Sequence, residues 1–170
     1  MTPRVVSLML LTAATCGCGY MLGTPTVPGV RTVHVEIFKS DSFRRNLDYL
    51  LTEAVQREVR TRGGYRLEDV SIADTILKGK IVEIRKTPLS ENRFDDPREL
   101  QLMVGAEVTW MDRRSGQILQ QKTFPLASEL TQQASSVTFA PEVGQSLATA
   151  QQEAAQRLAS RIVDLMEAPW

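Results

Sequence analysis

The segment LQLMVGAEVTW, residues 100–110, has the clearest pattern in the chain and decides the type of fold. Every second residue is apolar; this set is Leu100, Leu102, Val104, Ala106, Val108 and Trp110. Successive side chains of a strand point to opposite faces, so the pattern predicts a strand with one buried face. The turn-forming segment DRRSG, residues 112–116, comes next, and residues 117–126 are predicted to return as an antiparallel partner.

Two more strands are expected before this hairpin. Residues 32–38, TVHVEIF, alternate apolar and polar side chains, and residues 73–86 are also strand-like. In the second of these the apolar parity changes between Ile81 and Val82, which predicts a bulge. Residues 87–98, TPLSENRFDDPR, are predicted to form a loop, and residues 127–140 are polar and irregular.

Two amphipathic helices are predicted. The first spans residues 43–62, after the cap candidates Ser40, Asp41 and Ser42, and ends at Gly63. The second is expected to open at Pro141 and to run to about Glu167. Its buried stripe is predicted to be Val143, Leu147, Ala150, Ala154, Leu158, Ile162 and Leu165.

The element order is therefore β-α-β-β-β-α. Strands with one apolar face and helices with one apolar stripe bury these surfaces against each other. We expect the α+β class: a two-layer α/β sandwich with two helices packed on a four-stranded mixed sheet. Residues 32–168 would form a single domain.

The first residues have a different character from this domain. Arg4 precedes an apolar run at residues 5–14, and small residues follow it. This order is typical of a secretory signal peptide, the alternative being a buried first strand or helix.

Cys16 and Cys18 stand just behind this run. A disulfide between them would be strained, a zinc site needs about four ligands, and a redox pair has two intervening residues. Their position resembles the lipobox of bacterial lipoproteins, where a thiol is acylated and the preceding peptide is removed. Gly17 favours Cys18 as the lipidated residue, with Cys16 as the alternative. The sequence thus predicts a signal peptide at residues 1–17 and a lipidated tether at residues 18–31.

The balanced net charge argues against a nucleic-acid partner, but the central strands carry a group of basic residues. The chain has 20 Lys+Arg and 20 Asp+Glu, so no basic excess indicates nucleic-acid binding. The basic residues of the central strands and their turn are Lys78, Lys80, Arg85, Lys86, Arg113, Arg114 and Lys122. Several of these could gather at one end of the sheet and contact phosphates of an anionic glycolipid. The alternative is a solvated surface balanced by Glu83, Glu107 and Asp112.

Catalytic motifs are sparse. Asp95 and Asp96 are adjacent acids beside Pro97, a context typical of turns, and a hydrolase that uses them is the least favoured hypothesis. A nucleophilic triad would depend on His34, the one histidine of the chain. We therefore expect no enzyme.

Three segments carry a resemblance to the LptE family of lipopolysaccharide-assembly lipoproteins. Residues 18–22, CGYML, are similar to the lipidated opening of that family, and residues 33–59 resemble its first strand and helix. Residues 62–69, RGGYRLED, and 73–81, ADTILKGKI, resemble the region of its second strand. The resemblance covers residues 18–165.

The resemblance implies a lipid-anchored outer-membrane protein that faces the periplasm and has a two-layer α/β fold. Members plug the β-barrel LptD and help to insert lipopolysaccharide into the outer leaflet; they are not enzymes and need no cofactor. An alternative remains open: an envelope lipoprotein that binds and activates or tethers a periplasmic cell-wall enzyme.

Overall fold

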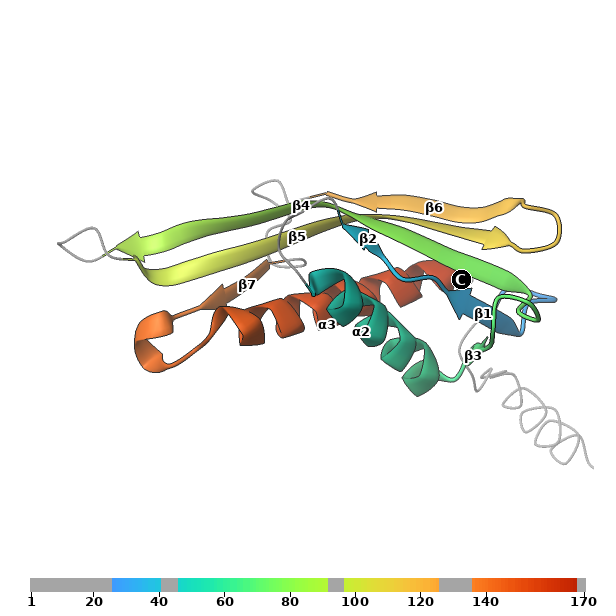
Figure 1. Cartoon of the computed structure of the whole chain (residues 1–170), viewed down its shortest axis with the longest axis horizontal. Coiled ribbons are helices and arrows are strands. Elements are labelled where there is room, and N and C mark those ends of the chain that lie inside the picture. Colours follow the sequence, from blue (N-terminus) through green and yellow to red (C-terminus); the bar gives the residue numbers. More distant parts are fainter. Residues whose placement is uncertain (1–25, 41–45, 92–96, 126–135, 168–170) are drawn as a thin grey trace, which may run out of the picture.

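The computed structural model describes residues 26–40, 46–91, 97–125 and 136–167. The strands are β1 (Thr32–Val35), β2 (Lys39–Ser40), β3 (Arg66–Leu67), β4 (Thr75–Glu91), β5 (Pro97–Asp112), β6 (Ile118–Phe124) and β7 (Ser136–Phe139). The helices are α2 (Leu47–Arg62), the short 3-10 helix η2 (Pro141–Val143) and α3 (Leu147–Met166). Both α-helices lie against one face of the sheet, so the expected two-layer α+β architecture is confirmed (Figure 1).

The sheet is mixed and has seven strands in the described part of the chain, so the expected number of four was too small. Its main path is β3-β1-β4-β5-β6, while β2 pairs with β4 and β7 pairs with β5. Strands β1 and β2 run parallel to β4, and β5 runs antiparallel to it. Each of the other described strands pairs with β4 or β5, except β3, which pairs with β1.

Residues 100–110 form a strand with one buried face, as their alternating pattern predicts. Trp110 and Val108 have no exposed surface, and both belong to the core formed with the two helices. The bulge is also confirmed, because the register with β5 shifts between Ile81 and Glu83. We call the sheet face under the helices the helix face and the opposite one the open face.

The predicted loop at residues 87–98 was wrong at residues 87–91 and 97–98, and residues 92–96 lie outside the described residues. Strand β4 continues to Glu91 and β5 begins at Pro97, so residues 87–91 and 97–98 belong to the long antiparallel β4–β5 pair. The apolar alternation is weak here because no helix needs an apolar face at the tip: Leu89 is 51% exposed. Strand β7 was missed because it has only four residues, inside a segment that is otherwise polar.

The helix boundaries differ from the predicted ones at the start of each helix. Helix α3 begins at Leu147, where the hydroxyl of Ser146 accepts the backbone N–H of Thr149. The preceding η2 ends at Gly144, whose φ of 84° breaks the helix, and Val143 is exposed rather than buried. Helix α2 begins at Leu47; of its cap candidates, Asp41 and Ser42 lie outside the described residues, and Ser40 belongs to β2.

The C-terminal end of α2 behaves as predicted. Gly63 adopts a φ of 68°, and its N–H donates to the carbonyl of Val59, which closes the last turn. Beside it, the Arg62 guanidinium donates to Glu58 at 2.8 Å in its own helix and to Glu167 at 2.8 Å. Burial opposes this charge, but the hydrogen bonds to the carboxylates outweigh it and raise the pKa of Arg62. Arg62 therefore ties the ends of α2 and α3 together.

Part of the segment assigned to the tether lies on the domain. Val27 and Val30 pack against the core, and the Val27 N–H donates to the hydroxyl of Tyr65 at 3.0 Å. That hydroxyl in turn donates to the carbonyl of Met166 at 2.7 Å. The described chain thus joins the domain beside the C-terminal ends of both helices.

Candidate functional site

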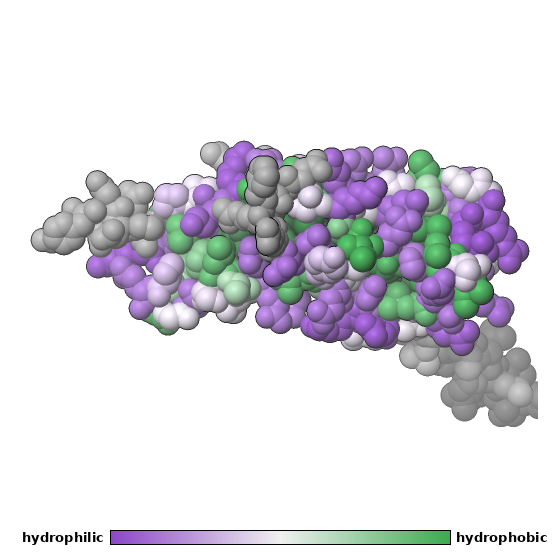
Figure 2. All heavy atoms as spheres, viewed as in Figure 1, coloured by the Kyte–Doolittle hydropathy of each residue, from purple (hydrophilic) through white to green (hydrophobic). Residues whose placement is uncertain are grey.

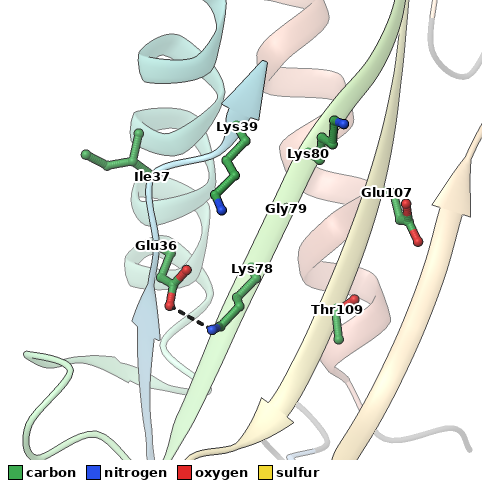
Figure 3. Close-up of a pocket in the computed structure, with 8 residues that line it drawn as sticks. All are labelled: Glu36, Ile37, Lys39, Lys78, Gly79, Lys80, Glu107 and Thr109. Atoms are coloured by element: carbon green, nitrogen blue, oxygen red, sulfur yellow. Dashed lines mark ion pairs between the residues drawn. The ribbon is translucent and has the colours of Figure 1, made fainter. Parts of the chain in front are cut away.

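A hollow on the open face lies where the chain leaves the sheet between β1 and β2. Strand β1 pairs with β4 up to Leu77, and β2 pairs with it again from Lys80. Between the two strands, Ile37 is 57% exposed, whereas Phe38 turns inward and is 1% exposed. The break in pairing leaves a hollow of about 250 Å³ against β4 and β5, called the open-face hollow below (Figure 3).

Phe38 fits at this break because β4 has a glycine there. A Cβ on Gly79 would stand 2.0 Å from Cε1 of Phe38, so the ring occupies the space of the missing side chain. The Phe38 N–H donates to the Thr52 hydroxyl at 3.0 Å, which attaches this segment to α2. The sequence therefore forms the hollow through one close contact between an aromatic ring and a glycine.

Five charged side chains line the open-face hollow: Glu36, Lys39, Lys78, Lys80 and Glu107. The Lys78 ammonium is 3.1 Å from the Glu36 carboxylate, and Lys80 stands opposite Glu107 in the register of β4 and β5. Figure 3 shows the Lys39 side chain reaching from β2 toward the strand that carries Lys78. Three ammonium groups and two carboxylates give the hollow an excess of one positive charge.

This arrangement suits a ligand with anionic groups. Lysine binds phosphate as a compact point charge. Three lysines from two strands could therefore contact an anionic ligand in more than one orientation. Because the side chains are largely exposed, the attraction would be screened by salt.

The structure brings only some of the predicted basic residues together. Lys78 and Lys80 share the open-face hollow, and the sequence reasoning missed Lys39 as their neighbour. Arg85 and Lys86 follow the bulge, opposite Met103 and Leu102, and therefore point to opposite faces. The Arg85 guanidinium is 2.8 Å from Glu83 in its own strand.

The arginines of the hairpin turn lie at one end of the sheet. The Arg113 side chain donates to the carbonyl of Ala73, and its backbone N–H donates to the carbonyl of Asp74. Arg114 stands near Asp112, whose carboxylate accepts the backbone N–H groups of residues 114 and 115. The hydrogen bonds from Ser115, above all, lower the pKa of Asp112.

Lys122 belongs to the opposite face. It pairs with Val108, whose side chain is buried under the helices, so Lys122 points to the helix face. Its ammonium lies 5.4 Å from the ring centroid of Phe124, and Arg161 of α3 lies 5.3 Å from the same centroid. Lys122 therefore packs against an aromatic ring and is separate from the open-face hollow.

The other residues considered as candidates lie apart from the open-face hollow or outside the described residues. The Nδ1–H of His34 donates to the carbonyl of Glu68 at 3.1 Å, in a shallow depression beside α2. Cys16, Cys18, Asp95 and Asp96 lie outside the described residues. In the part of the chain that is described, no three acidic, histidine or cysteine side chains converge to hold a metal ion. Neither described α-helix is both long and apolar enough to cross a membrane.

Solved structures with the same architecture have little sequence in common with this chain. The hypothetical protein CT253 from Chlamydia trachomatis is similar with a TM-score of 0.55 and 13% identity, over 79% of this chain and 94% of its own. The PelC dodecamer from Paraburkholderia phytofirmans gives 0.53 and 14%, over 87% and 96%. A protein from Xanthomonas campestris gives 0.51 and 11%, over 85% and 90%. No curated protein sequence matches the chain.

Fold and site together define a small α+β domain with one open, charged sheet face and a shallow hollow on it. The model of the LptE family, described as lipopolysaccharide-assembly, matches residues 30–167. The chain belongs to the LptE family. The resemblance predicted from the sequence is therefore confirmed, and membership gives the chain a general role in lipopolysaccharide assembly.

Proposed function

We propose that the chain is an outer-membrane lipoprotein, anchored through Cys18 and facing the periplasm, that assists lipopolysaccharide assembly as the plug or partner of an LptD-like β-barrel. The observation that carries the proposal is the family match, which runs from just before β1 to the end of α3. No catalytic step and no cofactor are part of this function. The domain would act by binding.

The open face supplies a contact surface for the glycolipid in this proposal. Lipopolysaccharide carries phosphate and carboxylate groups, and the side chains of Lys39, Lys78 and Lys80 line one hollow. Arg85, Arg113 and Arg114 remain candidates for further contacts, whereas Lys86, opposite the buried Leu102, points to the helix face.

Affinity purification tests the partner and the anchor at once. The full chain with a C-terminal tag is purified from native outer membranes, and mass spectrometry identifies both the partners and the N-terminal peptide. A β-barrel of the LptD type and an acylated Cys18 are expected. An acylated chain that brings down a cell-wall enzyme and no barrel would overturn the partner. An unmodified N-terminus would overturn the anchor.

Glycolipid binding tests the hollow itself. The triple variant Lys39→Gln, Lys78→Gln and Lys80→Gln should bind purified lipopolysaccharide at least several-fold more weakly than the unaltered protein. Lys122→Gln is the matched control, because it removes an exposed cation from the other face. Equal losses per removed charge in the two variants would show that binding follows total charge and not the open-face hollow.

A further inference from the structure

Strand β6 has no strand partner on its outer side in the described part of the chain. It stands last in the strand order β3-β1-β4-β5-β6 and pairs only with β5 (Figure 1). In an antiparallel ladder, every second residue of the outermost strand points its N–H and C=O groups away from its neighbour. Residues 118 and 120–123 are exposed, so the described chain leaves this strand accessible.

The outer side of β6, called the outer edge below, is long and regular enough to receive another strand. Strand β3, at the other end of the strand order, has only two residues, whereas β6 has seven. Residues 120–124 pair without interruption with residues 106–110 of β5, and the irregularity in register lies before them. Strand edges that are not blocked are sites for the addition of a further strand.

The surface around β6 is mainly polar. The strand has Gln120, Gln121 and Thr123 among its exposed residues, and Figure 2 shows hydrophilic side chains along much of the upper rim of the molecule, where β6 lies in Figure 1. A partner would therefore bury little apolar surface on this strand. Its main gain would come from hydrogen bonds with the backbone.

Two cations stand beside the outer edge, on the helix face. The Lys122 ammonium lies 5.4 Å from the ring centroid of Phe124, and the Arg161 guanidinium lies 5.3 Å from it. Within the described residues, neither cation forms an ion pair with a carboxylate. An aromatic ring attracts cations but carries no net charge to balance them.

The acids of the neighbouring elements are engaged elsewhere. On α3, the Glu153 carboxylate is 2.5 Å from the Arg157 guanidinium, and the Asp164 carboxylate is 2.5 Å from that of Arg62. On β5, Glu107 lines the open-face hollow on the opposite side of the sheet. Among the described residues, the two cations over the ring are therefore not balanced by a neighbouring acid.

The backbone of β6 distinguishes a polypeptide partner from an anionic lipid. An outer strand offers both donors and acceptors, and a second strand satisfies both. A lipid phosphate offers acceptor oxygens and would leave the carbonyl groups of β6 unpaired. A side chain on an added strand would stand about 5 Å from its neighbour on β6, so an acid there would reach the two cations.

We propose that an extended segment of a partner protein pairs with the outer edge of β6 along residues 118–124 and that acidic side chains of this segment contact Lys122 and Arg161. The inference deepens the proposed function and rests on the barrel partner named there. Strands of a closed barrel are already paired on both sides, so the segment belongs to a loop or a terminal stretch of that partner. The glycolipid contacts of the open-face hollow are separate from it.

Amide hydrogen exchange tests the backbone pairing directly. The full chain is compared alone and in complex with a co-expressed LptD-type barrel, and mass spectrometry follows the peptide that contains residues 118–124. Its slow-exchanging fraction should grow, because the outward amide groups exchange at least tenfold more slowly in the complex. Purified lipopolysaccharide added to the full chain alone should leave the exchange of this peptide unchanged.

A pair of charge-removing variants tests the acidic character of the partner segment. Lys122→Met with Arg161→Met removes both charges and keeps apolar cover over the Phe124 ring. In the complex, residues 118–124 of this variant should exchange at least threefold faster than in the unaltered protein. Arg57→Met with Arg60→Met removes two exposed charges from α2, and this matched control should leave the exchange unchanged. Equal exchange in the two variants would overturn the role of the cations.

The remaining outcomes separate this inference from the proposed function. A complex in which residues 118–124 exchange as fast as in the free chain overturns the strand pairing alone. Failure to recover any barrel with the full chain overturns the partner on which the pairing rests. Slower exchange of this peptide with lipopolysaccharide alone overturns the polypeptide occupant and assigns the outer edge to the glycolipid.

Discussion

Replacing Gly79 with alanine should destabilise the domain through a single contact. The new Cβ would stand 2.0 Å from Cε1 and 2.4 Å from Cδ1 of Phe38. The ring cannot swing aside freely, because Phe38 is 1% exposed and its N–H is bonded to Thr52. Forcing an extra methyl into a packed core costs about 1–3 kcal/mol, and we expect Gly79→Ala to lower the free energy of unfolding by this amount.

Urea unfolding followed by the fluorescence of the fully buried Trp110 measures the effect. Lys78→Ala is the control on the same strand, and loss of its exposed ion pair should change stability by less than about 1 kcal/mol. Phe38→Leu makes room for the methyl group, so the double variant should be at least about 0.5 kcal/mol more stable than the sum of the single changes. Strict additivity would refute the contact as the cause.

Three further predictions concern other parts of the domain. Arg62→Gln should cost roughly 2 kcal/mol, since it removes charge-assisted hydrogen bonds between α2 and α3, and equal urea midpoints for variant and parent would contradict this role. Ser146→Ala should cost about 1 kcal/mol in thermal unfolding because the Thr149 N–H loses its cap, with Ser146→Asp retaining most of the stability. For Asp74, the backbone hydrogen bond from Arg31 above all lowers the pKa below its ordinary value of 3.8. The contribution of Asp74 to the free energy of unfolding is therefore complete above pH 3.8 and is lost as the pH falls through the lower folded pKa. Asp74→Asn should reduce the loss of stability at acid pH in an unfolding titration. An unchanged loss would exclude Asp74 as its cause.

Local periodicity explains which parts of the fold were predictable. The apolar residues of 100–110 belong to the core between the sheet and the helices, so every second side chain had to be apolar and the strand could be predicted from the sequence. Residues 87–91 extend past the helices, where no buried face constrains their composition, and only pairing with β5 makes them a strand. Strand β7 likewise owes its existence to pairing with residues 100–103, a contact between distant segments.

The candidate site was harder to predict from the sequence than the fold, because it is formed by contacts between distant segments. The two-residue spacing of Lys78 and Lys80 indicated that they share a face, and the structure agrees. Lys39 joins them only because β2 pairs in parallel with β4, which no local pattern records. Lys122 could not be assigned to a face without the register of β6, since a shift by one residue would have turned it to the open side.

The contact between Phe38 and Gly79 links the stability of the fold to the geometry of the site. Because Phe38 turns inward, the chain leaves β4 after Glu36 and returns at Lys39, and this detour creates the open-face hollow. A larger residue at position 79 would push the ring and with it the backbone that carries Glu36 and Lys39. The packing of one ring on the helix face therefore positions charged groups on the opposite face, and the glycine is required by the hollow as much as by the core.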